Sequence, residues 1–216
     1  MELLIIILLL AASLVGVTFI IERGFALRWK KVVPPEVENA VANCREPSDL
    51  PMLRRVCEQN PSPLSRLLLL ADKNRDWPRE ENVDGLQTRA RYEVARLERG
   101  LVLLEIVVGI APLLGLVGTI YGLIILFGGM GETGLGDNNS MARGIALALR
   151  ATLMGLLTAI PSLIAWSYYN KKVETLAVEM ETLCDEFLRC QYRNESAEVS
   201  TAKKHKSTQR GAAATQ

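Results

Sequence analysis

Histidine is almost missing from this 216-residue sequence, which has only His205, and no two cysteines stand in C-x-x-C spacing. Histidine is the commonest general base in enzymes and, with cysteine, a usual zinc ligand. We therefore expect no catalytic residue, no metal site and no cofactor. The four cysteines, Cys44, Cys57, Cys184 and Cys190, are expected to be reduced thiols.

An excess of one charge is also missing, because 25 Lys and Arg residues balance 24 Asp and Glu residues. A nearly neutral chain has no bulk attraction for nucleic acid, so we expect no nucleic-acid partner. Charged residues still make up 23 % of a chain that is 49 % hydrophobic. Apolar segments must therefore alternate with segments that are exposed to water.

Long runs without charge occur three times, at Leu3–Ile21, at Ile106–Gly131 and at Gly144–Asn170, where Arg150 is the one interruption. An apolar helix of about 20 residues spans the hydrocarbon core of a bilayer. The sequence predicts an all-α, multi-pass membrane protein with transmembrane helices at 1–21, 100–130 and 144–170.

The first run differs from a cleaved signal peptide, because its basic residues follow the apolar stretch instead of preceding it. We interpret it as an uncleaved anchor.

Lys and Arg are distributed unevenly between the segments that flank the spans. The segment 22–99 holds 15 of them and the chain from Lys171 holds 8, whereas the loop 131–143 holds one. Basic segments stay in the cytoplasm. We expect 22–99 to be a cytoplasmic helical segment, and the N-terminus and the loop to be periplasmic.

Seven prolines between residues 32 and 84 predict short helices separated by turns. From Leu86 apolar residues recur every three to four positions and continue through Gly100 into the second span. We predict one helix that protrudes into the cytoplasm, with Glu93 among the charged residues on its other faces.

A similar apolar stripe follows the third span, so we expect 171–193 to be a cytoplasmic amphipathic helix. The polar residues 194–216 are expected to form a disordered tail.

Small residues recur at three- and four-residue steps along the second and third spans, which is typical of helices that pack closely in lipid. The expected packing residues are Pro112, Gly115, Gly118, Gly122, Gly144, Gly155 and Pro161.

Thr119 and Thr152 stand near the middle of these stripes. A membrane threonine commonly bonds its own helix carbonyl. The alternative is a hydroxyl that lines a hydrated path, where it can donate and accept hydrogen bonds.

Glu105 lies two heptads before Thr119 and so near the same helix face. It is either an interfacial carboxylate on a proton path or the partner of a neighbouring arginine. Arg150 must reach the outer interface, a partner or a cavity, because a charge in hydrocarbon is costly. No Asp or Glu lies in the middle of a span, so a proton relay would need a carboxylate from another protein.

Residues 110–122 read IAPLLGLVGTIYG, and residues 144–161 read GIALALRATLMGLLTAIP. These two motifs resemble those of a known family, the MotA/TolQ/ExbB proton channels. Both are similar to the second- and third-span motifs of ExbB and TolQ. The sequence departs from these at Leu147, where the family has Glu, and at Ala151, where it often has Thr.

The resemblance implies a motor stator of the bacterial inner membrane, a homopentamer around two copies of a single-span ExbD- or TolR-like partner. That partner carries a membrane Asp, which Thr119 and Thr152 would flank, and protons are the coupling ion. Such complexes couple proton flow to work on an envelope system such as protein transport. The alternative is a structural membrane scaffold that conducts nothing.

Overall fold

A computed structural model of the protein describes residues 2–133 and 138–193, and all the regular elements in these ranges are helices. The chain divides into two compact units. The first comprises residues 1–27 and 97–173, and the second comprises residues 28–96 and the chain from residue 174. The tail predicted at 194–216 lies outside the described residues.

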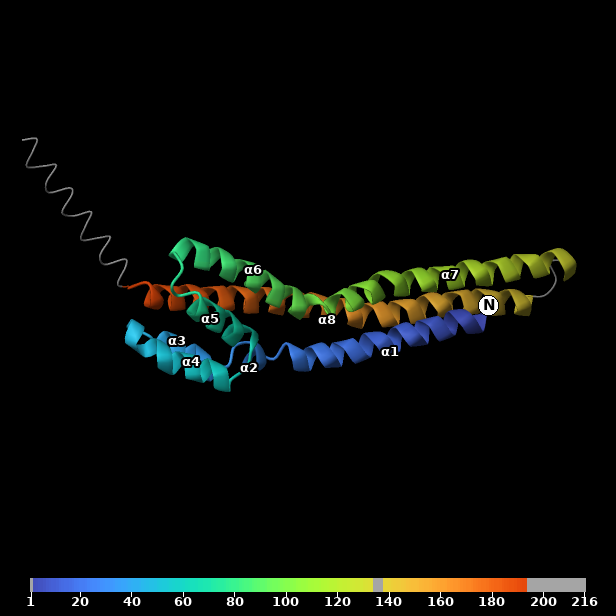
Figure 1. Ribbon diagram of the computed structural model, residues 1–216. Helices are drawn as coiled ribbons and strands as arrows, with labels where there is room; N and C mark the ends of the chain where they lie inside the picture. Colours follow the sequence, from blue (N-terminus) through green and yellow to red (C-terminus); the bar gives the residue numbers. More distant parts are fainter. Residues whose placement is uncertain (1, 134–137, 194–216) are drawn as a thin grey trace, which may run out of the picture. The chain divides into compact units, whose positions relative to one another are not determined.

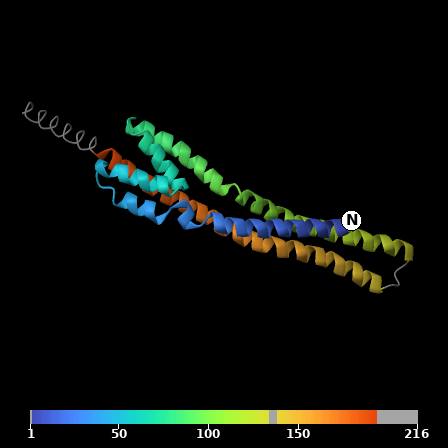
Figure 2. The ribbon, with the colours of Figure 1, turned by 60° about the horizontal axis from the view of Figure 1, so that its bottom comes forward.

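The first unit consists of three long helices that lie side by side (Figures 1 and 2). They are α1 (Glu2–Ala26), α7 (Leu101–Thr133) and the part of α8 (Asn138–Gln191) up to residue 173. Each is long and apolar enough to cross a membrane, over Leu4–Ala26, Leu101–Gly128 and Gly144–Gln191. The predicted all-α chain with three candidate membrane-spanning helices is confirmed.

The prediction of one helix running through Gly100 is wrong, because α6 (Arg79–Glu98) ends before α7 begins at Leu101. Arg23 of α1 donates a hydrogen bond of 3.2 Å to the Leu97 carbonyl. A Cβ atom on Gly100 would clash with the Arg23 guanidinium. The break thus lies where an arginine from another helix contacts the backbone, a contact that helical periodicity does not reveal.

The connection between the second and third spans is shorter than predicted. Helix α7 continues to Thr133 and α8 begins at Asn138, so both ends of the expected loop 131–143 are helical. Residues 134–137 lie outside the described residues. Asn138 and Asn139, which suggested a longer turn, belong to the first turn of α8.

The second unit contains the short helices that the prolines predict. They are α2 (Trp29–Val32), α3 (Pro35–Ala42), the 3₁₀ helix η1 (Pro47–Asp49), α4 (Leu50–Gln59) and α5 (Pro63–Lys73), followed by α6. Proline occupies one of the first two positions of α3, η1, α4 and α5, where its missing N–H costs nothing. Ser62 caps α5 by accepting a hydrogen bond from the Ser65 N–H.

Glu93 of α6 is 1 % exposed, so its predicted place among the exposed charged residues is wrong. The Glu93 carboxylate accepts two hydrogen bonds from Arg66, at 3.1 and 2.7 Å, and pairs with Arg89 at 3.0 Å and Arg96 at 3.9 Å. Burial raises the pKa of the Glu93 carboxyl. The Arg66 hydrogen bonds and the three positive charges outweigh that effect and hold the pKa below its ordinary value.

Two of the four cysteines are not the free thiols that we expected. Cys44, after α3, forms a disulfide with Cys190 in the last turn of α8, across 146 residues of sequence. Cys57 and Cys184 are free and buried. The fold brings the end of α8 back to the turn after α3, and the spacing of cysteines in the sequence contains no sign of that return.

Candidate functional site

Helices α7 and α8 touch backbone to backbone along a row of small residues. A Cβ atom on Gly155 would lie 2.7 Å from the Ala111 carbonyl oxygen, and one on Gly115 would lie 3.1 Å from Thr152 Cα. Only glycine allows this approach without moving the helices apart.

The row extends toward the connection between the two helices. A Cβ atom on Gly122 would lie 3.1 Å from Ala148 Cβ, and one on Gly144 would lie 3.1 Å from Leu126 Cδ1. Side chains at residue 147 and in the range 129–141 are outside the described residues. The Leu147 departure from the family motif therefore has no structural account.

Helix α1 packs antiparallel to α7 and parallel to α8. A Cβ atom on Gly16 would lie 3.0 Å from Ser162 Oγ of α8 and 3.5 Å from Val107 of α7. Tyr169 of α8 donates a 2.9 Å hydrogen bond to the Ile20 carbonyl of α1. Sequence reasoning missed Tyr169, although a tyrosine near the end of a span is a common interfacial anchor.

Thr119 and Thr152 flank the tightest contact between α7 and α8. Each directly follows one member of the Gly118–Ala151 pair, in which a Cβ atom on the glycine would clash with the alanine methyl group. The two threonines therefore lie at the same level of the helix pair. Both side chains are half-buried within this chain.

The two hydroxyl groups differ in their hydrogen bonds. Thr119 donates to the Leu116 carbonyl of its own helix at 2.7 Å. Within the part of the chain that the structure describes, the Thr152 hydroxyl has no hydrogen-bond partner. Bonding to its own helix, the simpler of our two interpretations, thus describes Thr119 but not Thr152.

Helix geometry places both threonines on one flank of the α7–α8 pair. Successive residues are separated by about 100° around a helix axis. Measured from the contact between Gly118 and Ala151, Thr119 and Thr152 each lie about 100° around their own helix in the same sense. Because the helices are antiparallel, both side chains leave the pair on the same side.

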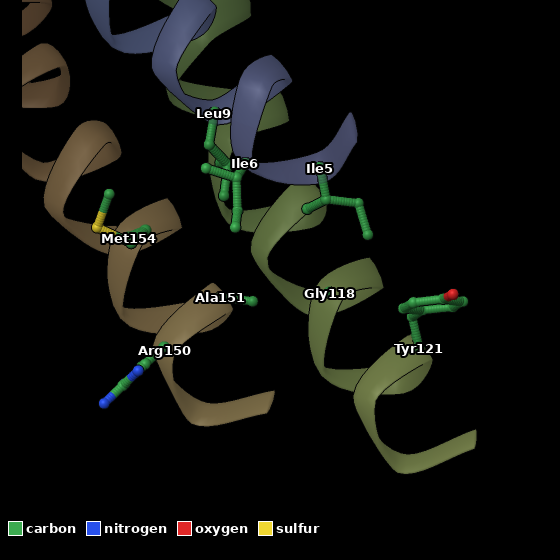
Figure 3. A pocket seen from close by; sticks show the side chains of 8 residues that line it. All are labelled: Ile5, Ile6, Leu9, Gly118, Tyr121, Arg150, Ala151 and Met154. Atoms are coloured by element: carbon green, nitrogen blue, oxygen red, sulfur yellow. The ribbon is translucent and has the colours of Figure 1, made fainter. Parts of the chain in front are cut away.

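The opposite flank at this level carries a groove between α1, α7 and α8 (Figure 3). Tyr121 of α7 and Arg150 of α8 line it together with Ile5 and Ile6 of α1. The threonines and the end of α1 are thus on different sides of the pair.

The other predicted site residues lie along the same two helices. Pro112 is half-buried in α7, and Pro161 is exposed in α8. Glu105 is exposed in the first turn and a half of α7, about 21 Å along the helix from Thr119. Among the described residues it has no ion-pair partner, so the arginine pair that we considered for it is not formed within this chain.

No group of three His, Cys, Asp or Glu side chains that could hold a metal ion occurs among the described residues. Between Ile106 and Asn170 no carboxylate lies within either span. What the site offers is two hydroxyl groups, a close helix contact and an uncharged flank. A hydroxyl group can donate a hydrogen bond to a carboxylate or exchange hydrogen bonds with water, but it does not itself become charged by binding or releasing a proton.

Comparison with known proteins points to one family. Residues 60–182 match the model of the MotA/TolQ/ExbB proton channel family. The chain is 30 % identical to the Tol-Pal system protein TolQ of Pseudomonas aeruginosa over 198 residues, which are 85 % of this chain and 84 % of TolQ. It is 33 % identical to the biopolymer transport protein ExbB of Aquifex aeolicus over 105 residues, 49 % of this chain and 70 % of that protein.

Proposed function

Because the chain belongs to the MotA/TolQ/ExbB proton channel family, we propose that it is the pore-building stator subunit of a proton-driven complex in the bacterial inner membrane. The family is one of proton channels and not of enzymes, and the three apolar helices make the chain a multi-pass membrane protein. The observation that carries the proposal is the pair of threonines at one level of α7 and α8, on the flank away from α1.

The proposed partner is a single-span protein of the ExbD or TolR kind that carries an Asp within the membrane. A proton relay through a bilayer usually requires a protonatable side chain, and no Asp or Glu lies in the middle of either span, between Ile106 and Gly131 or between Gly144 and Asn170. The Thr152 hydroxyl, which has no hydrogen-bond partner among the described residues, supports this assignment, because a polar group in lipid costs free energy unless another molecule satisfies it.

In the proposed cycle, the partner's Asp takes up a proton near Thr119 and Thr152. The protonated, neutral carboxyl group and the ionised carboxylate prefer different environments, so loading and unloading would shift the partner within its housing. Thr152 would hydrogen-bond the carboxylate or an ordered water directly. Thr119 would first have to release the Leu116 carbonyl, which makes it the weaker ligand in the resting arrangement.

Five copies of the chain around two copies of the partner form the proposed assembly. Much of the apolar surface of α7 and α8 supports contact with further subunits or lipid, since Leu113, Leu149 and Leu157 are each at least 58 % exposed in the single chain. The row of glycines brings α7 and α8 close together and leaves the threonine flank free for such neighbours.

The test is reconstitution of the purified complex, with its single-span partner, into vesicles that contain a pH-sensitive dye. We expect inward proton flux driven by an imposed potential. The mass of the complex should fit five copies of this chain and two copies of the partner. Replacing the partner's Asp with Asn should stop the flux while the complex stays assembled. Flux without the partner, or flux that survives the Asp replacement, would contradict the proposal.

A structural scaffold that conducts nothing would need the same close contacts between α7 and α8. It would not need a hydroxyl at residue 152. The vesicle experiment separates the two functions, because a scaffold assembles with its partner and shows no proton flux under any imposed potential.

A further inference from the structure

The groove on the α1 side of the helix pair is an apolar cavity of about 230 Å³ next to a single charge (Figure 3). Its walls are Ile5, Ile6 and Leu9 of α1, Tyr121 of α7, and Arg150 and Met154 of α8. It exists at this level because Gly118 and Ala151, which form its floor, have almost no side chain.

Arg150 is the one charged residue in the three long apolar runs of the sequence. Its side chain is exposed, and it has no ion pair or hydrogen bond with any part of the chain that the structure describes. In Figure 3 its guanidinium group extends away from the isoleucine side chains of α1. A guanidinium ion next to hydrocarbon is strongly unfavourable unless an anion or water meets it.

The depth of the groove suits a lipid headgroup. Ile5 lies beside Gly118, since a Cβ atom on Gly118 would be 3.6 Å from Ile5 Cγ2. Ile5 is also the second residue of the candidate span Leu4–Ala26. Arg150 is therefore level with the N-terminal end of that span, while the candidate spans of α7 and α8 continue past this level. Its long side chain can extend along α8 toward the nearer membrane surface. Leu9 and Met154 lie about one helical turn deeper, so the apolar part of the groove leads from the surface into the bilayer.

We propose that this groove binds an acyl chain of an anionic phospholipid whose phosphate accepts hydrogen bonds from Arg150. The guanidinium fork matches phosphate oxygens in geometry and charge. A zwitterionic lipid brings its own cation to the same place, so charge complementarity favours an anionic headgroup. The site does not depend on the proposed function.

A carboxylate of a membrane partner is the alternative anion for Arg150. Arg150 and Thr152 are separated by about 200° around α8, and Arg150 is on the α1 flank. A partner helix that approaches the threonines is therefore on the wrong side of α8 to pair with this arginine. That geometry favours the lipid.

The test uses the full chain in nanodiscs made from equal parts of phosphatidylglycerol and phosphatidylcholine. Retained lipid is then counted by native mass spectrometry after transfer to detergent. We expect phosphatidylglycerol to be retained in preference, and Arg150→Gln to reduce that preference about fivefold, the effect of one basic residue at an anionic surface. Arg150→Lys should keep part of it. The control Arg189→Gln removes the same charge from an exposed position of α8 and should change nothing.

A second measurement does not depend on the stability of the Arg150 variants. A photo-reactive benzophenone side chain at residue 6, on the groove wall, should cross-link to labelled phosphatidylglycerol, and the same group at exposed Ile164 should not show this preference. Equal retention of both lipids by the unaltered chain would overturn the proposal. So would a preference for phosphatidylglycerol that is unchanged in Arg150→Gln, or a cross-link from residue 6 to a protein.

Discussion

In the first unit, Gly155 of α8 lies against the Ala111 carbonyl of α7, whereas in the second unit the Glu93 carboxylate meets three arginines. The first unit exposes apolar side chains and holds its helices together with close contacts and few polar bonds. The second unit buries apolar side chains and adds ion pairs, caps and a disulfide. Lipid supplies no hydrophobic force between helices, so close packing replaces it in the first unit.

The disulfide is the strongest stabilising feature that distinguishes the second unit. Cys44→Ser, or reduction of the bond, should lower the free energy of unfolding of that unit by about 2–4 kcal/mol. The reason is that a closed loop of this length restricts the unfolded chain. Hydrogen exchange of α3 and α4 in oxidised and reduced protein measures the loss. Cys57→Ser is the control, because Cys57 is a free thiol, and reduction that leaves exchange unchanged would contradict the expectation.

The glycine contacts should be the feature to which the first unit is most sensitive. Gly155→Val forces a methyl group against the Ala111 carbonyl and should cost about 1–3 kcal/mol of stability. Gly109→Val is the matched control, since a Cβ atom on Gly109 would meet no atom within 4 Å. Denaturation in mixed micelles compares the two. Equal losses would show that close approach of α7 and α8 is not what holds the unit together.

Glu93→Gln should destabilise the second unit by about 1–3 kcal/mol, because three arginines lose their common carboxylate. The folded-state pKa lies below the ordinary value of 4.5, so the stabilisation is present above about pH 4.5. It is lost as the pH falls through the lower folded-state pKa. Chemical denaturation of both proteins at pH 7 and at pH 3 should give a difference that shrinks in acid. A difference that grows would contradict this sign.

The hydrogen bond between Tyr169 and the Ile20 carbonyl is the smallest effect that we predict. Tyr169→Phe should cost about 0.5–1.5 kcal/mol and leave the fold intact. Tyr168→Phe is the control on the exposed neighbouring position. Thermal unfolding in detergent, followed by circular dichroism, is precise enough to compare the midpoint temperatures of the two variants. Identical midpoints would mean that α1 is held to α8 by packing alone.

The two units also differ in how far the sequence predicts them. In the first unit, uncharged runs are a property of one helix at a time, so the three candidate spans can be predicted from the sequence. The second unit depends on contacts between distant residues. The Cys44–Cys190 bond joins residues 146 apart, and Glu93 is buried by Arg66, 27 positions away.

The same limit applies within the candidate site. The levels of Thr119 and Thr152 follow from the glycine register, but the missing hydrogen bond of Thr152 does not follow from its residue type. Thr158 of the same helix donates to the Met154 carbonyl at 3.0 Å. Helical periodicity also does not predict the break at Gly100, where Arg23 of another helix contacts the backbone.

The most direct test of the central claim measures proton flux in the reconstituted complex after replacement of single threonines in α7 and α8. Thr152→Val removes the hydroxyl that has no hydrogen-bond partner in the described ranges 2–133 and 138–193, and Thr158→Val removes one that is already bonded to its own helix. We predict that Thr152→Val abolishes partner-dependent proton flux, that Thr119→Val does the same, and that Thr158→Val and Thr152→Ser keep it, with every complex assembled. Full flux through both Thr152→Val and Thr119→Val would contradict the assignment of these residues to the proton path.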